Sequence, residues 1–270
     1  MPSDKRQRKR QNAQLRHHAI AQERRKADFR RRVITAVVVL ALFAGVVGLI
    51  TVANSGDDET DVSTTATTAG EQPESTTTAP DAKPAVAPTC PPADGSAEQH
   101  QNFTGPFEGC IDPAKTYRAV VETDVGAFTI ELDDEQAPKT VDNFVSLARH
   151  HYYDGIVFHR VIPGFVVQGG DPTGTGSGGP GYDFEDELPG PGEYELGSVA
   201  MANSGPDTNG SQFFIVTGDQ GVQLPPSYSL FGKVTEGMDV VEKIEADGTE
   251  GGTPTVTHKI VKVTISEQKG

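Results

Sequence analysis

The sequence of 270 residues contains no tryptophan, and several motifs that mark other enzyme classes are missing from it. There is no G-x-S-x-G nucleophile motif and no G-K-[ST] motif, so neither a serine-hydrolase nucleophile nor a P-loop is predicted. The string GTGSGG at 174–179 matches G-x-G-x-x-G, but Pro180 and Gly181 follow where a dinucleotide site needs a helix to begin. Residues 169–181 are therefore predicted to form a loop.

Cysteine is also scarce, because Cys90 and Cys110 are the only two in the chain. With His100 as the one histidine between them, they would make a weak zinc site. An even pair outside the reducing cytosol is most simply a disulfide, and this one would hold an N-terminal extension to the domain that follows. No metal or cofactor is predicted.

Basic residues are rare after the first 32 positions. Residues 1–32 hold 12 Lys/Arg and 3 Asp/Glu, whereas the rest of the chain holds 11 and 35. So acidic a domain is a poor candidate for nucleic-acid binding, which needs an electropositive face. The basic segment is interpreted as a topology signal, with a nucleic-acid-binding tail as the alternative.

One uncharged apolar run, residues 33–53, is long enough to cross a bilayer. A cleaved signal peptide is the competing interpretation, but its apolar region is normally shorter. With Arg30–Arg32 before the run and acidic residues after it, the expected protein is a single-pass protein of the cell membrane. Its N-terminus would be cytoplasmic and its catalytic domain extracytoplasmic.

The remaining chain divides by composition. Residues 54–89, rich in Ser, Thr, Ala and Pro, cannot bury enough apolar surface to fold and are expected to form a disordered linker. Residues 90–116 form the extension carrying the cysteines, and residues 117–270 form the main domain. Within that domain, the acidic cluster at 185–187 is interpreted as solvated surface.

Short strand patterns dominate the main domain, and glycine and proline are abundant between them. After Pro138, apolar residues at helical spacing predict a helix over 138–150, and a shorter helix fits 237–246. This pattern favours an antiparallel barrel or sandwich. The strands are expected at 117–122, 128–133, 156–161, 164–168, 197–202, 211–217, 229–234 and 258–266.

Three blocks carry the chemistry: FHRVIPGFVVQGGD at 158–171, MANSGPDTNGSQFFIVT at 201–217 and SLFGKVTEGMDVVEKIE at 229–245. In this order and spacing they closely resemble the cyclophilin family of peptidyl-prolyl cis-trans isomerases, over about residues 117–266. The resemblance implies a mainly β fold, a closed eight-stranded antiparallel barrel capped by two helices. The expected form is a bacterial, membrane-anchored one.

The resemblance also implies a site for proline. It assigns the catalytic arginine to Arg160, and the proline pocket, substrate contacts and positioning groups to residues around it. A tryptophan of many relatives is replaced by Gln223, and a histidine by Tyr228, so a cyclosporin-type inhibitor is expected to bind weakly. The remaining residues assigned to catalysis are Phe165, Gln168, Asn203, Gln212 and Phe214, and those assigned to substrate binding are His159, Val166, Ala202, Leu224 and Tyr228.

The chemistry of X-Pro isomerisation fits these residue types. Rotation must overcome a resonance barrier of about 18–20 kcal/mol without making or breaking a covalent bond. An arginine that hydrogen-bonds the proline nitrogen weakens that resonance, and neither nucleophile nor metal is needed. We expect a monomeric isomerase that assists the folding of exported or cell-surface proteins. The alternative is a non-catalytic chaperone or scaffold module that binds proline segments.

Overall fold

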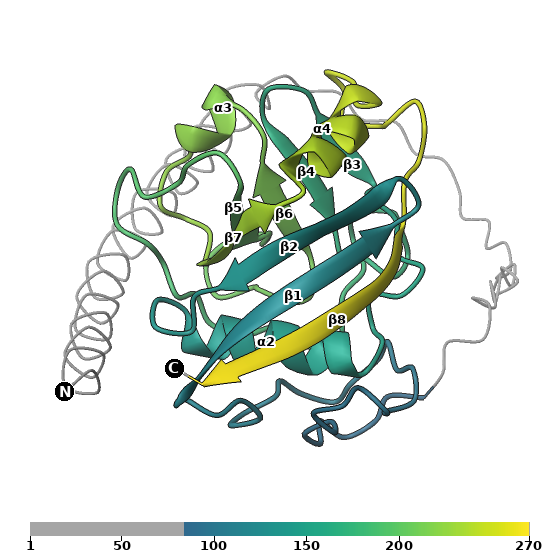
Figure 1. The fold of residues 1–270 in the computed structure, drawn as a ribbon, viewed down its shortest axis with the longest axis vertical. Helices are drawn as coiled ribbons and strands as arrows, with labels where there is room; N and C mark the ends of the chain where they lie inside the picture. The colour runs from purple at the N-terminus through teal and green to yellow at the C-terminus, as the bar shows by residue number, and fades with distance from the viewer. Residues whose placement is uncertain (1–83, 270) are drawn as a thin grey trace, which may run out of the picture. The chain divides into compact units, whose positions relative to one another are not determined.

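The structure is a computed structural model that describes residues 84–269. The predictions for residues 1–32, for the membrane helix at 33–53 and for most of the linker at 54–89 lie outside these residues. Within them, eight strands form one antiparallel sheet in the order β3-β4-β6-β5-β7-β2-β1-β8 (Figure 1). The strands are β1 (Lys115–Thr123), β2 (Gly126–Leu132), β3 (Arg160–Ile162), β4 (Val166–Gly169), β5 (Ser198–Met201), β6 (Phe213–Val216), β7 (Leu230–Glu236) and β8 (Ile260–Lys269).

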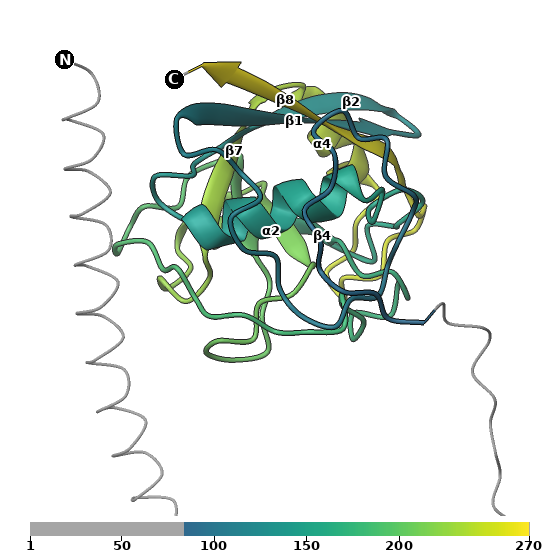
Figure 2. The same ribbon diagram turned by 90° about the horizontal axis from the view of Figure 1, so that it is seen from below.

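Three helices accompany the sheet in the described part of the chain: α2 (Pro138–Arg149), α3 (Asp219–Val222) and α4 (Met238–Ala246). The apolar face of α2 packs against β7 and β8, whereas α4 packs against β2, β3 and β4 (Figure 2). The two longer helices confirm the predicted ones. The four-residue α3 was not predicted, because so short a turn has no periodicity to detect.

The predicted closure of the barrel is wrong in one respect. No ladder of hydrogen bonds joins the edge strands β3 and β8. The edges meet at the start of β8, where the Ile260 N–H donates to the Ile156 carbonyl and the Ile260 carbonyl accepts from the Gly155 N–H (both 2.8 Å). Ahead of it, Val157 and Lys259 form an isolated antiparallel bridge, and the Phe158 N–H donates to the His258 carbonyl (2.9 Å). The reason is local: residues 156–159, predicted as strand, do not continue β3. The outer edge of β3 bonds instead to a loop, since Val161 N–H donates to the Gly252 carbonyl (2.8 Å).

The first hairpin shows how close the packing is. β1 and β2 are joined by the predicted turn, and Gly126 adopts a φ of 140° there. A Cβ at this position would lie 2.7 Å from a methyl group of Val240 on α4. Glycine is therefore required by both the turn and the close approach of the helix.

A carboxylate from a loop distant in the sequence caps the N-terminus of α2. Pro138 is in the first turn, and the helix has no side-chain cap of its own. Glu187, only 7% exposed, accepts from the N–H groups of Lys139 (3.2 Å) and Thr140 (2.8 Å). A carboxylate there satisfies free helix N–H groups and complements the helix dipole. The prediction that 185–187 is only solvated surface is therefore wrong for Glu187.

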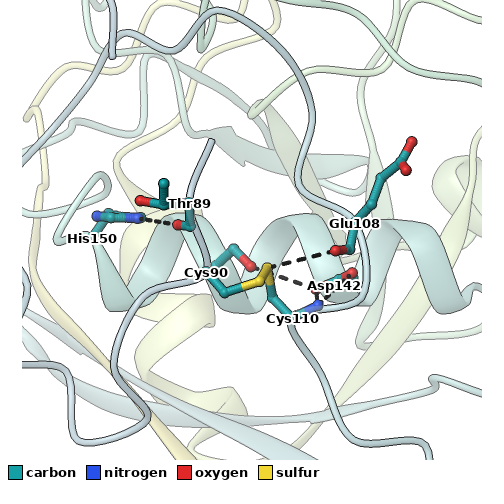
Figure 3. The surroundings of a disulfide bond; sticks show 7 residues. Thr89, Cys90, Glu108, Cys110, Asp142 and His150 are labelled. Atoms are coloured by element: carbon teal, nitrogen blue, oxygen red, sulfur yellow. Dashed lines mark hydrogen bonds between the residues drawn. A yellow bond between two sulfur atoms is a disulfide. The ribbon is translucent and has the colours of Figure 1, made fainter. Parts of the chain in front are cut away.

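The extension packs as part of the core. Phe103 and Phe107 are 1% and 3% exposed within the main hydrophobic cluster, and the Phe103 N–H donates to the Pro180 carbonyl (2.7 Å). The predicted disulfide between Cys90 and Cys110 is present, with a sequence separation of 20 (Figure 3). The extension is therefore in direct contact with the loop that contains Pro180.

Figure 3 also shows what fixes the disulfide on the domain. The Cys110 N–H donates to both carboxylate oxygens of Asp142 on α2, each at 3.1 Å. The carbonyl of Thr89 bonds to the His150 ring at 3.1 Å. Burial raises the pKa of Asp142, against the opposing effect of the N–H bonds that it accepts. The disulfide thus joins a segment that is also held by polar contacts with α2.

Candidate active site

The register of the sheet places the candidate residues in one row. Arg160 on β3 pairs with Gln168 on β4, and Gln168 pairs with Phe214 on β6. Directly paired residues of antiparallel strands project from the same face of the sheet. Their neighbours Val161 and Val167 belong to the main core, on the opposite face. Period-two alternation therefore presents arginine, glutamine and phenylalanine side by side, away from the core.

A second, smaller apolar cluster covers that outer face. Its buried members include Val166 and Phe214, which are 1% and 4% exposed. The rings of Phe214 and Tyr228 meet edge to face, with centroids 5.3 Å apart. Partly buried residues packed against this cluster are Phe165, Ala202, Val222, Leu224, Tyr228 and Leu230. The structure thus brings together all the apolar residues that the resemblance assigned to the proline pocket.

The arginine is held between a ring and an amide. The guanidinium carbon of Arg160 lies 5.5 Å from the centroid of the Phe165 ring. One guanidinium N–H donates to the Gln168 side-chain oxygen at 3.1 Å. The amide of Gln168 in turn donates to the Gln212 side-chain oxygen at 3.0 Å. Arginine has five donors, so one such bond leaves others for a substrate.

The Gly-rich loop completes this network. The side-chain NH₂ of Gln212 donates to the carbonyls of Gly176 (3.0 Å) and Gly178 (2.9 Å). The predicted loop over 169–181 is confirmed, but its carbonyls were not predicted to hold a residue of the site. The signal was the run of glycines, which leaves the backbone free of side chains where Gln212 approaches.

A cavity of about 420 Å³ opens beside Gln168 and Gln212. Its lining includes Gln168, Ala202, Asn203 and Gln212, together with residues 176–183. Ala202 also packs on the apolar cluster, so the cavity and the cluster adjoin at this residue. The site therefore has an apolar part and a polar part, and the glutamine pair belongs to the polar part.

Sequence could not specify the surroundings of Asn203, His159 and Gln223. The amide of Asn203 donates to the Ser227 carbonyl (2.9 Å), so its side chain holds the loop that carries Tyr228. Burial lowers the pKa of His159, and both of its buried ring nitrogens lack a hydrogen-bond partner among the described residues. Gln223, at the end of α3, is exposed beside the partly buried Leu224.

A match to a family model decides the family of this chain. Residues 118–265, more than half of the chain, match the model described as cyclophilin type peptidyl-prolyl cis-trans isomerase/CLD. The chain belongs to the cyclophilin family. It is therefore an enzyme that isomerises X-Pro peptide bonds, and its substrates are proline-containing polypeptides.

Individual relatives agree with this assignment. The chain is 45% identical over 154 residues to peptidyl-prolyl cis-trans isomerase-like 1 of Aspergillus fumigatus, a match that covers 55% of this chain and 95% of that protein. It is 50% identical over 132 residues to peptidyl-prolyl cis-trans isomerase-like 3 of Rattus norvegicus, covering 46% and 80%. A crystal structure of a Cryptosporidium parvum cyclophilin matches with 35% identity and a TM-score of 0.52, covering 57% and 99%.

The predicted localisation needs correction. The relatives are eukaryotic peptidyl-prolyl isomerase-like proteins, and their names describe no bacterial or membrane-anchored form. They contradict the prediction of a single-pass cell-membrane protein with an extracytoplasmic catalytic domain. Among residues 84–269, no helix has the length and apolar character needed to cross a bilayer.

Proposed function

We propose that the cyclophilin domain isomerises X-Pro bonds with Arg160 as the catalytic donor. Its guanidinium would hydrogen-bond the proline nitrogen as that nitrogen becomes pyramidal, which withdraws the lone pair from amide resonance. Arginine suits this role because it stays charged and has several donors in a fixed plane. The observation that carries the proposal is the bond of Arg160 to Gln168, which fixes one donor and leaves others free.

The remaining assigned residues would hold the substrate in two parts. Phe165, Phe214 and Leu224 would form the cup for the pyrrolidine ring, with Val166 in its wall and Tyr228 at its edge. This role is supported by their common apolar cluster. Ala202 and Asn203 would meet the peptide backbone, because they line the adjoining cavity. His159 would be a further substrate-binding residue. A site of this kind works by binding the twisted amide better than either planar form.

The proposed substrates are exported or cell-surface proteins. The support is the Cys90–Cys110 disulfide, because disulfides persist mainly in oxidising environments. We also propose that 90–116 and 117–270 work as one catalytic unit, given the burial of Phe103 and Phe107. A non-catalytic proline-binding module is not favoured, since the arginine and its partners are intact.

The test is a cis-to-trans isomerisation assay on residues 84–270, with the variants Arg160→Ala and Arg160→Lys. Removal of a donor that acts on the transition state should lower kcat/KM about 100-fold or more. Lysine should restore little, because a point charge lacks the planar fork of donors. Both variants should keep the melting temperature of the wild type. Near-normal turnover in Arg160→Ala would refute the assignment.

A further inference from the structure

Asp171 lies at the centre of the Gly-rich loop, and it is 1% exposed. One carboxylate oxygen accepts the N–H groups of Gly176 (2.6 Å) and Gly178 (3.1 Å). The other accepts the N–H (2.7 Å) and the hydroxyl (2.8 Å) of Thr173. These bonds outweigh the effect of burial and hold the pKa of Asp171 below its usual value. The group is therefore an ionised acceptor enclosed by its own loop.

The loop passes this constraint on to the glutamine pair. The peptide N–H groups of Gly176 and Gly178 point to Asp171, and the carbonyls of the same two residues accept the Gln212 NH₂. Two carbonyls can be satisfied only by the NH₂ end of an amide. The side-chain oxygen of Gln212 must then face Gln168.

The same reasoning fixes the next amide. Gln168 meets the oxygen of Gln212 with its NH₂ group, so its own oxygen is turned to Arg160. An inverted chain would direct an NH₂ group at the guanidinium, and two donors would then face each other. The direction of each hydrogen bond from the loop to Arg160 therefore follows from the Asp171 carboxylate, which is the acceptor at the start of the series.

We propose that Asp171 is a positioning residue for the isomerase reaction, which acts on Arg160 through the loop and the two glutamines. Its carboxylate sets the direction of the hydrogen-bond chain and so presents an acceptor to the arginine. This inference rests on the proposed catalytic role of Arg160. It requires no contact between Asp171 and the substrate.

Two variants perturb the start of this chain differently. In Asp171→Asn, an amide NH₂ in place of the oxygen that faces Gly176 and Gly178 would direct donors at donors with almost no change in volume. In Gly178→Ala, the added Cβ would lie 2.0 Å from a carboxylate oxygen of Asp171, so the loop must move away. Because residue 178 lies on a surface loop, this second variant keeps the test valid if Asp171→Asn does not fold. Thr173→Val is the matched control, since it removes the hydroxyl bonds to Asp171 and to Thr175 and keeps both glycine bonds.

The experiment measures kcat and KM for an X-Pro peptide, with Arg160→Ala and circular dichroism spectra recorded in parallel. We expect Asp171→Asn and Gly178→Ala to lower kcat about tenfold, the size typical of one lost charge-assisted hydrogen bond, with KM changed less than about twofold. Thr173→Val should keep wild-type kcat. In a Gln212→Ala background, Asp171→Asn should have less than about a twofold further effect, because the connection is already cut.

Normal kcat in folded Asp171→Asn or Gly178→Ala, or full additivity with Gln212→Ala, would overturn the inference. An equal loss in Thr173→Val would also overturn it, because it would indicate only general loosening of the loop. If Arg160→Ala itself keeps its activity, the proposed function fails first. If Arg160→Ala is inactive while Asp171→Asn turns over normally, the inference alone fails.

Discussion

Removal of the disulfide should destabilise the whole domain rather than release a loose tail. The double variant Cys90→Ser/Cys110→Ser opens a loop with a sequence separation of 20. That loop carries Phe103 and Phe107, which are both buried in the main core. If the extension unfolds in the variant, these two rings leave the core, so its stability is coupled to that of the sheet and α2.

The magnitude follows from the length of the loop. In the chain-entropy model, a disulfide that closes a loop of this size contributes about 3 kcal/mol by restricting the unfolded chain. Each kcal/mol shifts the melting temperature of a domain of this size by about 2–4 °C, so we expect a decrease of about 6–12 °C. The hydrogen bonds of Cys110 with Asp142 use the backbone N–H, so serine preserves them.

The assay is calorimetric unfolding of residues 84–270 with and without a reductant. The reduced wild type should have the same melting temperature as the double variant, and the reductant should not change the melting temperature of the variant. A decrease below about 2 °C, with loss of the bond verified by mass spectrometry, would refute the reasoning, because it would show that closing this loop does not stabilise the domain.

Two further predictions concern titration and inhibitor binding. Burial opposes the charge on His258, but its hydrogen bonds to Asp247 and Asp124 outweigh burial and raise its pKa. The stabilisation by His258 should be fully present below about pH 6.5, the pKa of an unfolded histidine, and should be lost as pH rises through the raised value. The difference in melting temperature between wild type and His258→Gln should therefore shrink as pH rises. A difference that stays constant with pH would contradict this. At the exposed Gln223, tryptophan should add apolar contact and tighten binding of a cyclosporin-type macrocycle about 10- to 100-fold, measured by calorimetry, with little change in isomerase rate on a short peptide. An unchanged affinity would show that residue 223 lies away from the bound ring.

Much of this fold could be predicted because the strands alternate cleanly. Ile130 and Leu132 on β2 are buried, whereas Glu131 between them is exposed, as period two requires. The apolar spacing of α2 was equally clear, and the residues at that spacing, Val141, Phe144, Val145 and Ala148, all lie in the main core. Local patterns of this kind need no knowledge of distant partners.

Apart from the short α3, the features that could not be predicted depend on which atoms the fold brings together. In the sequence, Glu187 is one of three consecutive acidic residues. Only the fold brings it to the start of α2, where it binds Thr140, 47 residues away in the sequence. The gap between β3 and β8 likewise depends on how residues 155–158 meet 258–260. Resemblance named Gln168 and Gln212, but the direction of their amides is a property of the loop around Asp171, which no spacing of residues encodes.

The position of Arg160 on a short edge strand explains why several other segments are needed to hold its side chain. β3 has only three residues and lies at the edge of the hydrogen-bonded sheet, with β4 on one side and a loop on the other. An edge strand gives a substrate open access, but it anchors a long side chain poorly, and holding such a side chain in one rotamer costs about 1.5–2 kcal/mol of entropy. Phe165 and Gln168 reduce the freedom of Arg160 before substrate arrives, and the loop around Asp171 in turn fixes Gln168 through Gln212. Behind the far end of that loop lies the extension, where the Pro180 carbonyl accepts from Phe103. The accessible edge and the rigid arginine are compatible only because the support comes from segments outside the strand itself.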